Sequence, residues 1–411
     1  MELHSLKPIP FQERNVSWAD LLLIWSGISL CVPSFIIGAV LIPTFSWYEA
    51  FSINFLGNLA VGCLIVLGGY FGTKTGLPAV MFGKYVFGER IGHLVPTACL
   101  IISTLGWFAV ITAITGQALN EIVKQNTGLS NPLLFIVLSG MLNSYTAILG
   151  FHSIKKYSRL SVPVLVFFCL WIAVRLFNDH ISKFEIDYVK TGEMSFWEGI
   201  DLVIGGYIAG ALAASDFSRY TLSNRANWMG VLPGTFFVSF ILGLLGMLLA
   251  AITGDWNPVK EIEQLGLGIP ALIFIFLASW TTNYNLLYSA GLAATNILPD
   301  KQRWKNTLIC GVVGTVLAVM GIETRLQDML SLLALIFSPL LGVLLTDLFA
   351  VKRLIKKGQS LQLPPNVNIP AIVSVLAGLM AVKILPDYLG TSVVGIFSSS
   401  LCYLVLKIKF K

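Results

Sequence analysis

Apolar runs of about 20 residues recur along the whole length of this 411-residue chain, and a helix needs about 20 such residues to cross a bilayer. Only 12% of the residues are charged, whereas a soluble domain carries about 25%. A soluble core of this size could not bury so many apolar runs, and continuous runs lack the alternation of a transmembrane β-barrel. The sequence therefore predicts an all-α membrane protein that crosses the bilayer many times.

We expect twelve transmembrane helices joined by short connections, with no separate extramembrane domain. The sequence begins with a polar stretch that lacks the apolar core of a cleavable signal peptide, so the first span should act as an uncleaved insertion signal. The twelve predicted ranges are 19–42, 50–71, 93–122, 132–151, 160–178, 198–215, 229–253, 269–292, 305–321, 327–349, 369–385 and 391–408.

The distribution of Lys and Arg predicts the orientation of these spans. If the N-terminus is cytoplasmic, 20 of the 27 Lys and Arg residues fall in cytoplasmic segments, as the positive-inside rule requires. We therefore expect a multi-pass protein of the inner (cytoplasmic) membrane with both termini cytoplasmic. This bias also accounts for the net charge of +6, so the lipid bilayer rather than nucleic acid is the expected partner of the basic residues.

The middles of the predicted spans contain almost no ionisable residues, although intramembrane charges usually mark proton relays and sites for charged substrates. This absence favours a neutral substrate and argues against a central proton-carrying carboxylate. The chain also lacks the residue pairs of a hydrolase or metalloprotease, so we expect no enzyme activity. The six cysteines lie in apolar segments without metal-ligand spacing, which is typical of packing residues.

Two predicted spans contain residues that interrupt a helix. Pro33 lies at the centre of the first span and frees the carbonyl of Ser29 from its helical hydrogen bond. Gly205 and Gly206 lie in the middle of the sixth span, where glycine makes a helix easy to unwind. Broken helices at matching places in two halves are typical of inverted-repeat transporters, in which unwound backbone binds substrate and ion. Ordinary kinks are the alternative interpretation.

The eighth span contains the sequence SWTTNYN, which places uncharged polar residues inside an apolar helix. At 100° per residue, Thr281, Thr282 and Asn285 share one face with Ala278, whereas Asn283 points to roughly the opposite side. The amide of Asn283 both donates and accepts hydrogen bonds, which suits the edge of an amide-like or pyrimidine-like ring. Asn285 is a further candidate substrate contact, and its alternative role is to order the ion site or a neighbouring helix.

The threonine face suits a monovalent cation such as sodium. The hydroxyls of Thr281 and Thr282 are oxygen donors, and the carbonyls near Ser29 and Val32 in the first span are the natural complement. Helix-end dipoles can replace a compensating carboxylate at such a site. The alternative is that these hydroxyls bond only within their own helix or to a neighbouring helix.

Two aromatic residues could hold a flat ring between them. Trp107 shares a face of the third span with Thr104 and Ile111. Tyr207 lies beside Gly206 in the sixth span. Stacking on aromatic faces adds about 0.5–1.5 kcal/mol beyond the burial of area, although packing is the alternative role for each residue.

Several segments resemble the cytosine permease branch of the nucleobase–cation symport-1 family. The resemblance extends from the first span to the twelfth and implies a LeuT-like fold of two inverted five-helix repeats (5+5) followed by two C-terminal helices, with helices 1 and 6 broken. The implied organisation is a cytoplasmic N-terminus (1–18), repeats at 19–178 and 179–349, and a cytoplasmic loop with helices 11 and 12 at 350–411. The segments are LGWFAV, GYFGTKTGL, GGYIAGALAASDFSRY and SWTTNYNLLYSAGL.

The resemblance also implies roles for individual residues. Trp107 stands where the family stacks its ring substrate, Tyr207 at the second aromatic position and Asn283 at the asparagine that binds substrate. Thr281 and Thr282 stand at the family's sodium positions, where Ala278 contributes a carbonyl.

Three residues of the chain depart from the cytosine permeases at positions near the implied substrate site. Thr104 replaces a Gln, Gly206 replaces a Ser and Tyr284 replaces an Asp. Two of these changes would remove side-chain hydrogen bonding at the ring edge. A site matched to cytosine would reject analogues strongly, so these changes leave the identity of the ring open.

The expected function is import of a neutral planar nucleobase-like heterocycle, cytosine or a related pyrimidine or purine, by alternating access and symport of a cation. Sodium is the expected coupling ion and no other cofactor is expected. A hydroxymethylpyrimidine thiamine precursor, hydantoin and allantoin stay open as substrates, and the proton as coupling ion. An amino-acid carrier of the same fold and a receptor that transports nothing are the remaining alternatives. A monomer is expected because no assembly motif is present.

Overall fold

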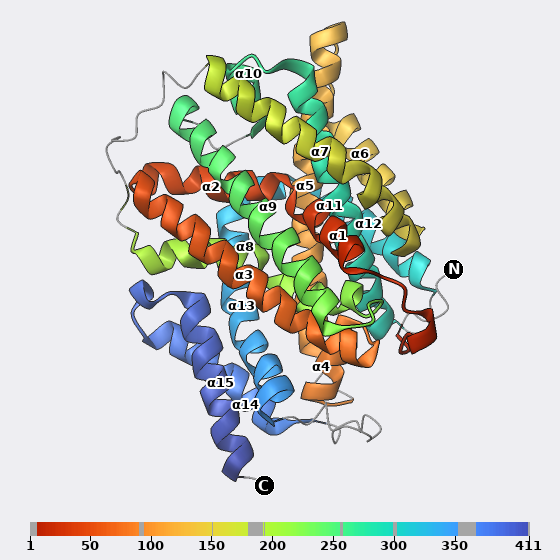
Figure 1. Ribbon diagram of the computed structural model, residues 1–411, viewed down its shortest axis with the longest axis vertical. Helices are drawn as coiled ribbons and strands as arrows, with labels where there is room; N and C mark the ends of the chain where they lie inside the picture. The colour runs from red at the N-terminus through yellow and green to blue at the C-terminus, as the bar shows by residue number, and fades with distance from the viewer. Residues whose placement is uncertain are drawn as a thin grey trace.

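The computed structural model describes residues 6–89, 94–149, 151–179, 192, 194–254, 258–298, 302–351 and 367–409. Within these residues the secondary structure is helical, apart from one isolated parallel bridge between Val16 and Thr221. Figure 1 shows the helices packed as one bundle, with both termini at its periphery. The helices of the N-terminal half are η1 (Phe11–Glu13), α1 (Trp18–Ser29), α2 (Val32–Thr44), α3 (Trp47–Thr75), α4 (Ala79–Phe87), α5 (Leu94–Thr127), α6 (Pro132–Ile148) and α7 (Phe151–Asp179).

The second half of the chain continues the bundle, and α13, α14 and α15 pack on one another at its side (Figure 1). Its helices are α8 (Phe196–Ser218), α9 (Asn224–Thr253), α10 (Pro258–Gln264), α11 (Gly268–Ile297), α12 (Arg303–Val319), η3 (Ile322–Arg325), α13 (Leu326–Thr346), η4 (Asp347–Val351), α14 (Ile369–Ile384), η5 (Asp387–Leu389) and α15 (Thr391–Lys409).

Every predicted span coincides with a helix, or in the case of 19–42 with the pair α1 and α2. Among the described residues, six helices are long and apolar enough to cross a membrane, and the bent pair α1–α2 makes a seventh if it is one span. Helix α11 is not among the six because it carries the polar residues around Asn283. The count of twelve spans therefore stays a prediction.

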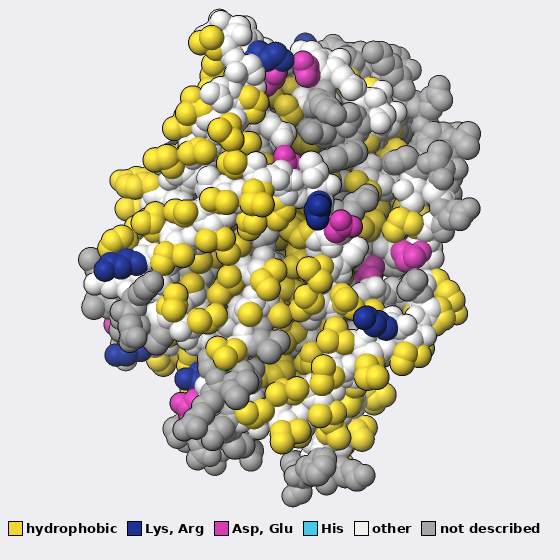
Figure 2. All heavy atoms as spheres, turned by 180° about the vertical axis from the view of Figure 1, so that it is seen from behind, with side chains coloured by type: hydrophobic (Ala, Val, Ile, Leu, Met, Phe, Trp, Pro, Cys, Tyr) yellow, Lys and Arg dark blue, Asp and Glu magenta, His cyan; other side chains and the backbone are white. Residues whose placement is uncertain are grey.

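The surface of the bundle is largely apolar. Figure 2 shows hydrophobic side chains over most of one face, with charged side chains few and in small groups. Large side chains such as Phe167, Phe237 and Phe397 are more than half exposed. A surface of this kind is costly in water, which agrees with a bundle whose exterior faces lipid.

Three helices begin with the same local arrangement of side chains. In α1, α3 and α8 the side chain of a serine caps the helix, and the carboxylate of an acidic residue three positions later accepts a hydrogen bond from the serine backbone N–H. This capping box satisfies two of the backbone groups that a helix start leaves without partners. The serines are Ser17, Ser46 and Ser195.

The centre of the bundle depends on glycines where helices approach closely. A Cβ at Gly68 of α3 would lie 1.7 Å from the carbonyl oxygen of Ala211 in α8, and one at Gly246 of α9 would lie 2.1 Å from the carbonyl oxygen of Phe35 in α2. Small residues at helix contacts are typical of membrane bundles, since van der Waals packing drives association there.

The first predicted span is interrupted as its proline indicates. Helix α1 ends at Ser29, α2 begins at Val32 with Pro33 in its first turn, and the two helices are bent by 54°. Proline is tolerated in a first turn because those N–H groups have no helical partner. The proline therefore begins a new helix here rather than kinking a continuous one.

The break predicted in the sixth span is absent, because α8 is continuous from Phe196 to Ser218. The glycines serve close packing instead. A Cβ at Gly206 would lie 2.4 Å from Cδ1 of Ile37 in α2, and one at Gly205 would lie 3.2 Å from Cβ of Ala334 in α13. Composition alone could not distinguish a glycine that permits unwinding from one that makes room for a neighbour.

Several contacts bring the starts of α1 and α5 and the ends of α8 and α11 to the same end of the bundle. The backbone N–H of Val16 donates to the carbonyl of Tyr220 at 3.1 Å. The hydroxyls of Tyr220 and Tyr288 lie 3.2 Å apart, and the Asn296 amide donates to the Thr97 hydroxyl at 3.0 Å. We refer to this end as the Tyr220 end; it is the predicted cytoplasmic side.

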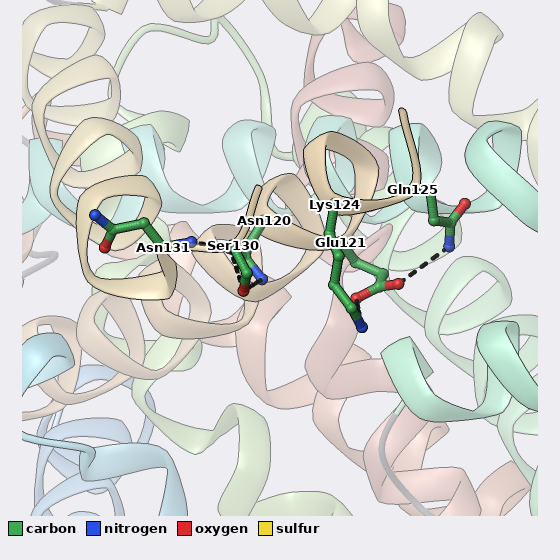
Figure 3. A network of polar contacts seen from close by, with 6 residues as sticks. All are labelled: Asn120, Glu121, Lys124, Gln125, Ser130 and Asn131. Atoms are coloured by element: carbon green, nitrogen blue, oxygen red, sulfur yellow. Dashed lines mark hydrogen bonds and ion pairs between the residues drawn. The ribbon is translucent and has the colours of Figure 1, made fainter. Parts of the chain in front are cut away.

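The opposite end of α5 is closed by a polar network at the turn into α6 (Figure 3). The side-chain oxygen of Asn120 accepts from the backbone N–H of Asn131 at 2.7 Å and from the Ser130 hydroxyl at 3.3 Å. Glu121 forms an ion pair with Lys124, with their atoms 3.0 Å apart. The Asn120 contacts fix the geometry of the α5–α6 connection, whereas the ion pair lies within the last turns of α5.

Candidate functional site

A cavity lies beside the α1–α2 interruption and is bounded by α1, α3, α5, α8, α9 and α11. It contains about 780 Å³ of empty space, which includes its opening. Among the described residues, none that lines it is Asp, Glu, His, Lys or Arg. It is lined by seven of the residues predicted for the substrate and ion sites: Ser29, Thr104, Trp107, Gly206, Tyr207, Thr282 and Asn285.

The two aromatic residues that are predicted to hold the ring lie at the wall of this cavity. Trp107 of α5 is 6% exposed. The Tyr207 hydroxyl of α8 hydrogen-bonds to Oγ of Ser34 in α2, and Ser34 in turn donates to the carbonyl of Ser29 at 2.6 Å. Because the Ser34 proton is used in that second bond, the Tyr207 hydroxyl is the donor in the first. Tyr207 is thereby held against the interruption of the first span.

The hydroxyl of Thr104 is engaged within its own helix, although the residue lines the cavity. It donates to the carbonyls of Leu100 and Ile101, at 2.7 and 3.1 Å. This is the common back-bonding of a helical threonine. In this geometry the Thr104 side chain presents its methyl group and a used hydroxyl rather than a free donor.

The two asparagines of α11 differ in position from what the sequence predicts. Asn283 is fully buried outside the cavity lining and donates to the Thr112 hydroxyl of α5 at 2.9 Å. Asn285 lines the cavity instead, and its amide nitrogen donates to the carbonyl of Thr281 at 2.6 Å. The side-chain oxygen of Asn285 has no hydrogen-bond partner. The asparagine on the threonine face is therefore the one that faces the empty space.

Five oxygen atoms converge where α11 contacts the end of α1. The Thr281 hydroxyl donates to the carbonyl oxygens of Gly27 and Ala278, at 2.9 and 2.8 Å. The Thr282 hydroxyl donates to the carbonyl oxygens of Ile28 and Ala278, at 3.1 and 3.2 Å. Both threonines are buried. Uncharged oxygens of this kind match the ligand preference of a hard cation.

The carbonyls at this cluster are not the ones that the sequence predicts from the first span. The carbonyl of Ser29 already accepts from the backbone N–H of Cys31 at 2.8 Å and from Ser34. Val32 belongs to the first turn of α2 rather than to the end of α1. The last carbonyls of a helix lack helical partners, and the exact end of α1 decides which of them face Thr281 and Thr282.

Three further polar groups of the cavity escape the sequence prediction. They are Nε1 of Trp25 and the hydroxyls of Ser103 and Ser289, none of which has a hydrogen-bond partner. Their side chains are 2%, 1% and 1% exposed. Ser289 shares the helical face of Thr282 and Asn285, so helix geometry could have identified it. Nothing in the sequence distinguishes Trp25 or Ser103 from ordinary packing residues.

Comparison with protein families identifies the kind of molecule to which this cavity belongs. Residues 8–404 match the sequence profile of the family described as permeases for cytosine/purines, uracil, thiamine and allantoin. The chain belongs to the nucleobase–cation symport-1 family. It is thus a multi-pass membrane transporter and not an enzyme.

Individual members of the nucleobase–cation symport-1 family are similar to this chain over most of their length. The cytosine permease of Escherichia coli (strain K12) is 27% identical over 406 residues, which cover 98% of this chain and 93% of that one. The hydantoin permease of Microbacterium maritypicum is 27% identical over 385 residues, covering 85% of this chain and 76% of that one.

Solved structures show that the fold is shared. Mhp1, a nucleobase–cation symport-1 family transporter in a closed conformation with bromovinylhydantoin bound, superimposes with a TM-score of 0.85 at 22% identity, over 100% of this chain and 95% of that one. A sodium-coupled sialic acid symporter gives a TM-score of 0.65 at 15% identity, over 96% and 90% of the two chains. The all-helical architecture predicted from sequence is therefore confirmed, as a fold shared with Mhp1.

Proposed function

We propose that the chain imports a neutral planar heterocycle by symport with sodium, through alternating access around the cavity at the α1–α2 interruption. Cytosine or a related pyrimidine or purine is the leading substrate class. Hydantoin, allantoin and a hydroxymethylpyrimidine are further candidates. Two relatives, a cytosine permease and a hydantoin permease, support these substrate classes. Twelve spans in a 5+5 inverted repeat, with the first span broken, complete the proposal.

The observation that supports a neutral ring most strongly is the polarity of the cavity. Its walls carry the aromatic residues Trp107 and Tyr207 and several uncharged polar groups, and no charged side chain among the described residues. The oxygen of Asn285 is buried without a partner, and leaving such a group unpaired costs about 1–3 kcal/mol. A ring N–H would relieve that cost, whereas a charged ligand would find no counter-ion in the lining.

The sodium part of the proposal rests on the oxygen cluster between α1 and α11. Thr281, Thr282, Gly27, Ile28 and Ala278 would supply the ligands, with the hydroxyl protons turned away from the ion. Thr282 also lines the cavity, so a bound ion would lie next to the substrate. Two ligands that share one wall stabilise the same arrangement of α1 and α11, which is the thermodynamic requirement for coupling.

Uptake into proteoliposomes tests the proposal. The purified chain is reconstituted and screened with radiolabelled cytosine, uracil, hypoxanthine, hydantoin, allantoin and hydroxymethylpyrimidine, and separately with amino acids. Each uptake is measured under an inward sodium gradient and again with choline in place of sodium at fixed pH. We expect accumulation of at least one ring compound that collapses in choline. Equal uptake in choline would remove sodium from the proposal. Accumulation of amino acids alone would favour an amino-acid carrier of the same fold.

A further inference from the structure

Three helices line the cavity with pairs of residues spaced four positions apart. Such a pair lies on one face of its helix, with one member about 6 Å further along the axis than the other. The first members surround the central position that the proposed function assigns to the ring. The pairs are Ser29 and Trp25 in α1, Trp107 and Ser103 in α5, and Asn285 and Ser289 in α11.

The second members all lie on the same side of the first members. Trp25 and Ser103 are nearer the starts of α1 and α5, and Ser289 is nearer the end of α11. The contacts of Val16, Tyr220 and Tyr288 join the ends of α1, α8 and α11, and the bond from Asn296 to Thr97 joins the end of α11 to the start of α5. Trp25, Ser103 and Ser289 therefore form a second layer of the cavity, one helical turn closer to the Tyr220 end.

This second layer carries three unsatisfied hydrogen-bonding groups. The indole N–H of Trp25 and the hydroxyls of Ser103 and Ser289 have no partner and are more than nine-tenths buried. Helical serines and threonines normally donate to a carbonyl of their own helix, as Thr235 does to Val231 at 2.7 Å on the same cavity. Three buried groups left unpaired on three different helices indicate a place where a polar ligand binds.

The walls of this layer suit a flat ring. Phe217 and Ala213 of α8 line the same part of the cavity, and the rings of Phe217 and Trp25 meet edge to face with their centroids 5.7 Å apart. The polar groups comprise one obligate donor, the indole N–H, and two hydroxyls that can donate or accept. A neutral heterocycle with a carbonyl or ring nitrogen acceptor would satisfy the indole, and its N–H groups would satisfy the hydroxyls.

We propose that Trp25, Ser103 and Ser289 form a second binding position for the transported heterocycle, one helical turn from the central position toward the Tyr220 end. This inference rests on the proposed function, since it takes the same ring as its ligand. A substrate that leaves the central position would exchange the partners at Asn285 for those at Ser103 and Ser289 before it is released. The second position therefore lowers the free-energy cost of moving a ring that has lost its water. Substrate that enters from the Tyr220 side reaches the second position before the central one.

The test measures the half-saturation, which is the substrate concentration that gives half-maximal uptake. It is measured from each side of the membrane, in right-side-out and in inverted vesicles. The probe is whichever of cytosine, uracil, hypoxanthine, hydantoin, allantoin and hydroxymethylpyrimidine the wild-type chain accumulates fastest. The variants are the double substitution Ser103→Ala/Ser289→Ala and the single substitution Trp25→Phe, which removes the indole N–H. Ser279→Ala is the matched control. Ser279 lies in α11, as Ser289 does, and is a fully buried serine without a hydrogen-bond partner, but it does not line the cavity.

We expect the double variant to raise half-saturation from the Tyr220 side about tenfold, as the loss of two hydrogen bonds predicts, and to change it less than twofold from the other side. Trp25→Phe should act in the same direction, and Ser279→Ala should leave both sides unchanged. A double variant that behaves like Ser279→Ala would mean that these groups bind only water, and equal shifts on both sides would place them at the central position; either result overturns the inference. A wild-type chain that accumulates none of the six compounds refutes the proposed function itself.

Discussion

The Thr281 hydroxyl of α11 lies 2.9 Å from the carbonyl oxygen of Gly27 in α1, a contact between residues 254 positions apart in the chain. This contact joins the polar segment of the eighth predicted span to the last turn before the interruption of the first. Thr282 makes a parallel contact with the carbonyl of Ile28 at 3.1 Å. The oxygen cluster and the break in the first span are therefore one structural unit, and a ligand bound to one constrains the other.

Replacing Thr281 or Thr282 by valine should lower the apparent affinity for sodium without preventing folding. Valine keeps the shape of threonine and removes one oxygen ligand. We expect the sodium concentration for half-maximal uptake to rise at least tenfold in Thr281→Val and in Thr282→Val, a change of about 1.4 kcal/mol or more. The measurement is uptake across a series of sodium concentrations at constant ionic strength.

Thr235→Val is the control for this series. Thr235 lines the same cavity, but its hydroxyl donates within its own helix to the carbonyls of Val231 and Leu232. The sodium dependence of this variant should match the wild-type chain. A shift as large as that of Thr281→Val would show that any cavity threonine has the effect, and the ion site would have to be placed elsewhere.

Trp107 is expected to hold the ring by stacking rather than by a hydrogen bond. Trp107→Ala should raise the half-saturation for the heterocycle at least tenfold, and Trp107→Phe should raise it less, since an aromatic face retains part of the stacking energy of about 0.5–1.5 kcal/mol. Thermal unfolding in detergent shows whether each variant is folded. If the alanine variant is folded and keeps the affinity of the wild-type chain, Trp107 does not contact the substrate.

The two asparagines of α11 provide a matched pair that separates binding from stability. Asn285 faces the cavity with an unpaired oxygen, so Asn285→Ala should raise the half-saturation for substrate about tenfold. The side-chain oxygen of Asn283 is unpaired as well, but Asn283 is fully buried outside the cavity lining and its amide nitrogen donates to Thr112. Asn283→Ala removes that hydrogen bond between α11 and α5, so it should lower the free energy of unfolding by about 1–3 kcal/mol and leave the affinity of the folded protein near the wild-type value. The opposite pattern would return the substrate contact to Asn283.

The sequence predicts the architecture well because its main determinants are local. The length of each apolar run sets the length of a helix, and all twelve predicted ranges coincide with helices of the structure. Pro33 marks the interruption of the first span within a few residues, since proline excludes a helical hydrogen bond wherever it occurs. The glycines of the sixth span have no such fixed consequence, and here Gly206 accommodates Ile37 in an unbroken helix.

The sequence predicts the site less completely, because the site depends on contacts between helices. Helix periodicity placed Thr281, Thr282 and Asn285 on one face, but it could not show which face meets the cavity. Ser103 and Thr104 are adjacent in sequence, yet the Thr104 hydroxyl bonds to its own helix and the Ser103 hydroxyl has no hydrogen-bond partner. Only the arrangement of side chains around the empty space distinguishes them.

The last prediction concerns the packing of α3 on α8, which forms one wall of the cavity. Gly68→Ala should destabilise the protein strongly, because the added Cβ would lie 1.7 Å from the backbone carbonyl oxygen of Ala211, which cannot move without shifting α8. Overpacking of this kind costs about 1–3 kcal/mol, and sometimes more. Gly210→Ala is the matched control on α8: its Cβ would meet Ile65 at 3.4 Å, an ordinary contact, and alanine favours a helix over glycine by about 1 kcal/mol.

We therefore expect thermal unfolding in detergent to occur several degrees lower in Gly68→Ala than in the wild-type chain, and at an equal or higher temperature in Gly210→Ala. Because Gly210 lines the cavity, its variant should also bind substrate more weakly while remaining stable. This combination separates a glycine that lets two helices meet from one that leaves room for a ligand. If the two variants unfold at the same temperature, the close approach of α3 to α8 is not what requires glycine at position 68.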